Sequence, residues 1–256
     1  MPKTPLLALN MLMILAISYV LYLGIEVLAR TAEIFIVILI FFGFTGNLFI
    51  YFSGNVDLHN LQPILENGWK PIVTKAFPRM CIFPFAEMLV FTMVLPYLNR
   101  PESAKKVWLS ALISSGIALS YTTALNIAVL GVKEVERSTF PLLTTIGMVN
   151  LFEFIQRLDA IVVFTLLITV FFKAAIYLYG AVIGMADLFK LKNYQSIILP
   201  TGMVLILFSM MISSNFAEQT EEGTVVDYLA VPLLLILPLI MLFVAIIRKW
   251  FKKKAN

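Results

Sequence analysis

The chain has 256 residues, of which 61% are hydrophobic and only 13% are charged, with a formal net charge of +4. A soluble domain of this length needs more polar surface than that to cover its core, so the composition excludes an ordinary soluble enzyme. The positive charge is no nucleic-acid signal, because it is concentrated in residues 248–254 and fits a membrane-flanking anchor.

Apolar stretches of about 20 residues follow one another along the chain, each long enough to cross a bilayer as a helix. They cover residues 6–23, 34–52, 79–97, 107–130, 159–185, 196–214 and 228–247. The alternating polar strands of an outer-membrane barrel are absent. We therefore predict an all-α, polytopic membrane protein of about seven transmembrane helices, forming a single transmembrane domain over residues 1–256.

The distribution of Lys and Arg predicts the orientation of these helices. The side that carries the basic C-terminal run holds most of the Lys and Arg, so the C-terminus is expected in the cytoplasm. An odd number of spans then places the N-terminus outside. A cleaved signal peptide is the alternative interpretation of residues 6–23, but no small-x-small cleavage site ends that run.

Two connections between spans have helical patterns. In residues 55–69 apolar residues recur at helical spacing behind Asn55 or Asp57, which predicts an interfacial helix with one of them as its cap. Residues 131–158 begin with charges and continue with an apolar stretch. We expect short helices there, packed over the extracytoplasmic mouth where an entrance lid would lie.

The span 79–97 carries the most informative local pattern, in which Phe83, Pro84 and Phe85 precede Glu87. Proline lacks an N–H and clashes with the carbonyl four residues back, so the helix is expected to kink or unwind there. Glu87 follows within a turn and lies near the middle of the span. Freed carbonyls and a carboxylate would make a polar site. The alternative is a simple kink with a protonated Glu87 bonded to a neighbouring helix.

Lys173 is the second ionisable residue near the middle of a span. A central lysine costs roughly 2.5 to 3.5 kcal/mol on insertion, so it predicts a partner or a water-filled cavity. Steps of four residues place Thr165, Thr169 and Tyr177 on the same helix face. A structural ion pair is the alternative role for Lys173.

We hypothesise that Glu87 and Lys173 face one central cavity. Desolvation would move their pKa values toward neutrality, and their mutual attraction would oppose that shift. Such a pair would serve proton coupling or the recognition of a zwitterion.

Enzymatic chemistry finds little support in this sequence. His59 is the only histidine and Cys81 the only cysteine, so no His- or Cys-based metal set can form within the chain. No phosphate-binding or dinucleotide-binding glycine motif is present. We expect no enzyme, no cofactor and no metal site.

Taken in order, the local motifs resemble those of the spore germination permease family, the B subunit of nutrient germinant receptors. The motifs that carry the resemblance extend over nearly the whole chain and lie at residues 24–30, 55–58, 61–68, 75–78, 83–87, 95–99, 128–131, 154–158 and 172–179.

This resemblance implies a fold similar to amino acid, polyamine and organocation transporters, with ten helices in two inverted repeats around a central site, as in LeuT-like proteins. The span with Pro84 looks like the sixth of these helices, which is discontinuous in such folds. The chain then corresponds to helices four to ten, and the first three are expected to be missing.

The resemblance also implies a function. The family acts in the inner membrane of bacterial spores beside A and C subunits, and senses small nutrients such as amino acids to trigger germination. Matching positions assign Phe83, Pro84, Phe85 and Glu87 to the ligand site and Lys173 to a basic position of the eighth helix. Two alternatives stay open: a proton- or cation-coupled amino-acid transporter, and a truncated remnant with a structural role.

Overall fold

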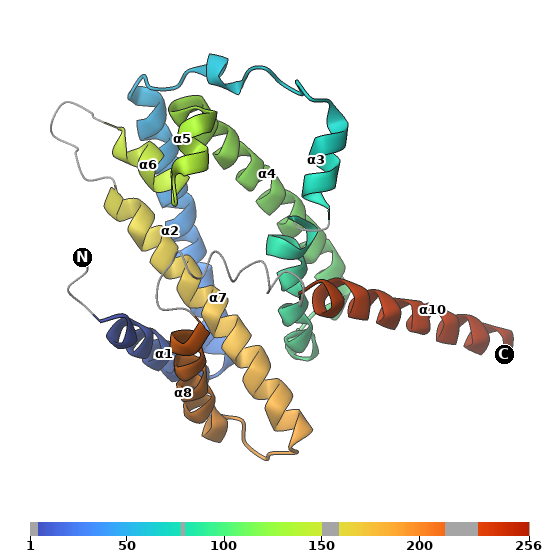
Figure 1. Cartoon of the computed structure of the whole chain (residues 1–256). Helices are drawn as coiled ribbons and strands as arrows, with labels where there is room; N and C mark the ends of the chain where they lie inside the picture. The colour runs from blue at the N-terminus through green and yellow to red at the C-terminus, as the bar shows by residue number, and fades with distance from the viewer. Residues whose placement is uncertain (1–4, 78–79, 150–158, 213–229, 256) are drawn as a thin grey trace. The chain divides into compact units, whose positions relative to one another are not determined.

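A computed structural model of the chain describes all residues except 1–4, 78–79, 150–158, 213–229 and 256 (Figure 1). In the described part of the chain every regular element is helical. Six helices there are long and apolar enough to cross a membrane, or seven if the bent pair Trp69–Ala76 and Cys81–Met93 forms one span. The prediction of an all-α, multi-pass membrane protein is therefore confirmed.

The chain folds into two compact units. Unit 1 comprises Met1–Glu66 and Leu98–Gly202, and unit 2 comprises Asn67–Tyr97 and Met203–Asn256. The last long helix of unit 1, α8, continues into unit 2. Each unit is described separately below.

Unit 1 contains the long helices and the short helices that connect them. They are α1 (Leu6–Leu23), α2 (Ile25–Phe52), the 3₁₀ helices η1 (Leu58–Leu61) and η5 (Pro101–Ser103), α4 (Ala104–Leu130), α5 (Val132–Arg137), α6 (Pro141–Gly147), α7 (Asp159–Leu188) and the start of α8 (Gln195–Ile212). Helix α7 packs against α1, α2 and α6, and α4 packs against α6 and η1. Figure 1 shows α7 running alongside α2.

Helix α2 begins nine residues earlier than residue 34, the predicted start. Gly24 alone separates α1 from α2, and its φ of 109° is readily adopted only by glycine. Glu26 and Arg30 then form an exposed pair at 2.8 Å across one helical turn. Hydropathy does not include this first part of the helix because it is charged, although Glu26 and Arg30 pair with each other. The other bounds of the long α-helices of unit 1 agree with the prediction to within a few residues.

The core of unit 1 contains a hydrogen bond between two buried polar side chains. The hydroxyl of Thr145 in α6 donates to Oδ1 of Asn126 in α4 at 2.9 Å. Apolar side chains pack beside this pair, among them Ile50, Leu125 and Ile146. The predicted short helices after residue 131 are thus confirmed as α5 and α6, while residues 150–158 lie outside the described part. Their role as a lid stays a prediction.

The prediction of one interfacial helix over residues 55–69 is wrong. Only the single 3₁₀ turn Leu58–Leu61 forms, capped by Asp57, whose carboxylate accepts a bond at 2.8 Å from the backbone N–H two residues later. Gln62 has φ −100° and ψ 150° because a residue before proline, here Pro63, is pushed toward extended backbone. The apolar spacing therefore continues past the point where the helix has to end.

Hydrogen bonds to helices α4 and α6 hold this connection instead. The amide of Asn60 donates to the carbonyl of Ala128 at 3.0 Å, near the end of α4. The amide of Asn55 donates to the carbonyl of Met148 at 2.9 Å, at the end of α6. These bonds satisfy carbonyls at helix ends that have no partner within the helix.

Unit 2 consists of short and irregular helices followed by one long helix. They are α3 (Trp69–Ala76), the π-helical turn η2 (Cys81–Phe85), the 3₁₀ helices η3 (Ala86–Met93) and η4 (Leu95–Tyr97), the π-helical turn η6 (Val231–Ile236) and α10 (Leu237–Ala255). Within this unit η6 packs against η2 and η3.

Helices α1 and α8 approach closely at a glycine. A Cβ added to Gly202 would lie 2.7 Å from Cγ2 of Ile14 and 3.4 Å from the hydroxyl of Ser18. The Ile14 methyl is a β-branch and cannot rotate away easily. We predict that Gly202→Ala lowers the stability of the detergent-solubilised protein by about 1 to 3 kcal/mol, measured by thermal unfolding. Gly147→Ala is the matched control, because its Cβ would meet nothing within 4 Å. Equal melting temperatures of the two variants would contradict this packing.

The buried polar pair gives a second prediction. Thr145→Val leaves the Asn126 carbonyl without its donor and should cost about 1 to 3 kcal/mol of stability in the same unfolding measurement. Replacing both partners, as in Thr145→Val with Asn126→Leu, should recover part of the loss. Thr123→Val is the control, because Thr123 is exposed and donates only to a carbonyl of its own helix. A Thr145→Val variant as stable as this control would refute the importance of the bond.

Candidate functional site

The predicted break in the span around Pro84 is present. Phe83 has φ −112° and ψ 122°, which is extended backbone within the helical segment. The residue before a proline avoids the helical region, and the proline itself supplies no N–H. The chain continues beyond the break as the 3₁₀ helix η3 instead of a regular α-helix.

Four predicted site residues surround this break in unit 2. Glu87 lies in the first turn of η3 and is half-buried, as are Pro84 and Phe85. Phe83 is 59% exposed. The broken helix therefore holds a partly buried carboxylate directly after an irregular backbone.

The predicted polar face of α7 belongs to unit 1, and its members have different surroundings. Thr169, Lys173 and Tyr177 are exposed, whereas Thr165 is half-buried. The hydroxyls of Thr165 and Thr169 donate to carbonyls four residues earlier, at 2.8 Å and 2.9 Å. The opposite face of α7 carries the buried side chains, including Ala175, which has no exposed surface. Since Glu87 belongs to unit 2, its approach to Lys173 stays a prediction.

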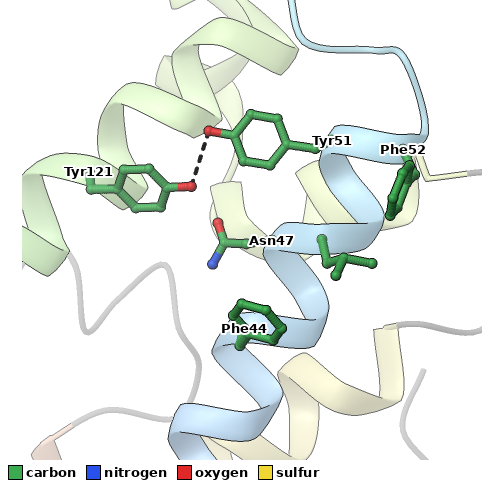
Figure 2. A pocket seen from close by; sticks show the side chains of 6 residues that line it. Phe44, Asn47, Tyr51, Phe52 and Tyr121 are labelled. Carbon is green, nitrogen blue, oxygen red and sulfur yellow. Dashed lines mark hydrogen bonds between the residues drawn. The ribbon is translucent and has the colours of Figure 1, made fainter.

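A pocket between α2 and α4 escaped the sequence analysis (Figure 2). We call it the outer pocket; its volume is about 440 Å³. Its lining consists of Phe44, Asn47, Leu48, Tyr51, Phe52 and Tyr121. Figure 2 shows the hydroxyls of Tyr51 and Tyr121 facing each other, and their oxygens are 3.2 Å apart. The two tyrosines are 70 residues apart in sequence, so no local pattern could pair them.

A smaller cavity, here called the inner cavity, lies between α2, α4, α6 and α7. Its volume is about 110 Å³, and its polar side chains are Asn47, Thr122 and Thr165. Asn47 lines both the inner cavity and the outer pocket. The structure thus gives Thr165 a different environment from the exposed residues farther along α7. One indication of this cavity was present in the sequence, because Asn47 is a polar amide within the predicted span 34–52.

The fold and the site define the class of the protein. Long apolar helices and a proline-broken helix with a partly buried carboxylate are features of a multi-pass membrane protein. Residues 1–217 match the spore germination protein family, and the chain belongs to this family.

Individual relatives agree with this assignment. Spore germination protein KB of Bacillus subtilis is 38% identical over 255 residues, which are 99% of this chain and 68% of that protein. Spore germination protein B2 of the same organism is 25% identical over 77% of this chain and 52% of its own length. Spore germination protein XB of Bacillus anthracis is 23% identical over 70% of this chain and 49% of its own length. No solved structure matches the chain.

The exposed face of α7 gives a prediction about water access. In a Cys81→Ser background, Lys173→Cys should react with a charged, membrane-impermeant maleimide, because a water-filled cavity would surround that position and support a thiolate. Leu167→Cys is the control in the same helix, since Leu167 lines a groove whose other side chains are almost all apolar. Labelling would be measured by mass shift in native membranes. If position 173 is as unreactive as position 167, Lys173 faces lipid and leaves the candidate site.

Proposed function

We propose that this chain is the permease-like membrane subunit of a nutrient germinant receptor. It binds a small nutrient, such as an amino acid, and this binding triggers germination. The observation that carries the proposal is the broken helix at Phe83 and Pro84, followed by the half-buried Glu87, in a chain of the spore germination family. A discontinuous helix around a midplane site is how transporters of related architecture hold small ligands.

The chemistry of the proposed site fits a zwitterion. The Glu87 carboxylate would receive the ammonium group of the ligand, and the Lys173 ammonium would receive its carboxylate. Phe83, Pro84 and Phe85 would line the broken segment beside Glu87, and Thr169 and Tyr177 would extend the face of Lys173. Opposite charges on ligand and site would lower the cost of keeping both ionisable side chains within the membrane.

The setting of the receptor forms part of the same proposal. The chain would act in the inner membrane of the spore with its C-terminus in the cytoplasm, beside A and C subunits. Its helices would correspond to helices four to ten of a LeuT-like inverted repeat. The homology to a germination protein over 99% of the chain supports this setting.

A second candidate function is proton- or cation-coupled transport of an amino acid. The half-buried Glu87 favours it, because carboxylates within membrane spans mark the pathways of ions and substrates. A sensor only binds the nutrient, whereas a transporter also moves the bound nutrient across the membrane. Uptake of a labelled amino acid without the other receptor subunits would favour transport over sensing.

Glu87→Gln tests the proposed site. In spores that germinate through this protein, the variant should fail to germinate at nutrient concentrations sufficient for the unaltered protein, since losing one partner of a charge contact that the bound ligand would bury costs about 2 to 5 kcal/mol. Germination is followed by the fall in optical density, and membrane levels by immunoblot. Glu102→Gln is the control, because Glu102 is exposed in the short helix η5. A normal nutrient response of Glu87→Gln would remove Glu87 from the site.

A further inference from the structure

Three polar side chains line the inner cavity, and each donates a hydrogen bond to a carbonyl of its own helix. Thr122 and Thr165 each donate their hydroxyl proton to the carbonyl four residues earlier, both at 2.8 Å. The amide nitrogen of Asn47 donates in the same way at 2.6 Å. A threonine oxygen in this arrangement keeps its lone pairs but has no proton left to offer, and the Asn47 oxygen is an acceptor only. The lining therefore holds three side-chain oxygens that can accept, against one remaining donor, the second amide hydrogen of Asn47.

The rest of the lining adds no formal charge. The remaining side chains are apolar, and Gly43 and Gly46 contribute no side chain at all. A Cβ at Gly43 would meet nothing within 4 Å, so this part of α2 borders open space. An anion would find too few donors here. Ca²⁺ and Mg²⁺ are bound mainly through carboxylates, and none lines the cavity.

Neutral oxygen ligands are suited to alkali cations, which membrane proteins hold with carbonyl and hydroxyl oxygens in place of hydration water. Since one water takes about 30 Å³ in the liquid, the volume of about 110 Å³ accommodates one such ion with two or three water molecules. These waters would complete a coordination shell that three protein oxygens leave open.

The outer pocket shares a lining residue with the inner cavity. Asn47 lines both spaces, so its side chain stands between them. In Figure 2 the aromatic rings of Phe44, Tyr51 and Tyr121 surround the approach to Asn47. Aromatic faces attract cations, and tyrosine hydroxyl oxygens accept bonds from the water that accompanies them.

We propose that the inner cavity is a binding site for a monovalent alkali cation, held by the oxygens of Asn47, Thr122 and Thr165 and reached past Asn47 from the outer pocket. This site is separate from the segment around Glu87 and does not rest on the proposed nutrient-sensing function. A bound ion would link α2, α4 and α7, because each of these helices supplies one of its ligands.

The test uses the full-length protein in detergent. Binding of radioactive sodium and the melting temperature are measured in sodium, potassium and N-methyl-D-glucamine chloride at equal ionic strength. Sodium or potassium should raise the melting temperature in a saturable way relative to N-methyl-D-glucamine, as expected for a ligand of the folded state. Thr122→Val and Thr165→Val keep the shape of the side chain but remove its oxygen. Each should weaken binding at least about tenfold, since an ion contact is worth more than about 1.4 kcal/mol.

Two further variants keep the proposal falsifiable. Thr123→Val is the matched control, because the Thr123 hydroxyl donates to its own helix at 2.9 Å but the residue does not line the cavity. Asn47→Asp should tighten cation binding and add a response to Ca²⁺, and it decides the question if the valine variants do not fold. A cavity that holds water only would show the same melting temperature in all three salts and no effect of Asn47→Asp. That result, or equal losses in Thr123→Val and Thr122→Val, would overturn the proposal.

Discussion

Hydrocarbon offers no hydrogen-bond partner, and this constraint governs the polar groups of the bundle. The hydroxyls of Thr122, Thr165 and Thr169 donate hydrogen bonds to carbonyls of their own helices. Where two polar side chains are fully enclosed, as Asn126 and Thr145 are, they bond to each other across helices. These polar side chains are thereby satisfied by the protein, and the bond between α4 and α6 also fixes which faces of these helices meet.

The same constraint connects the fold to its two candidate sites. Around Pro84 the backbone leaves the regular helix, and the half-buried Glu87 follows in the next turn. In unit 1 two of the three polar residues that line the inner cavity, Thr122 and Thr165, donate their hydroxyl protons to carbonyls of their own helices, so their oxygens remain as acceptors. Irregular backbone is tolerated within a membrane only where protein or a cavity surrounds it, so such places mark where small polar ligands or ions can be held.

The candidate residues differ in how far sequence could predict them. The break before Glu87 was predictable because proline acts on its own backbone and on the residue before it. Thr165 was predicted as a member of a polar face with Lys173, but it lines the inner cavity with Asn47 and Thr122 from two other helices. Helical spacing shows which residues share a face. It does not show what that face meets.

The sequence by itself determined the solvent of this protein, because 61% hydrophobic residues cannot be covered by polar surface. It also determined the apolar spans and the position of the broken helix, which depend on local composition and on proline geometry. The tertiary structure alone decided the pairings of distant residues, such as Tyr51 with Tyr121 and Asn126 with Thr145. It also tied the connection around η1 to α4 and α6 through Asn60 and Asn55. These contacts depend on how helix faces pack, and packing is a property of several segments at once.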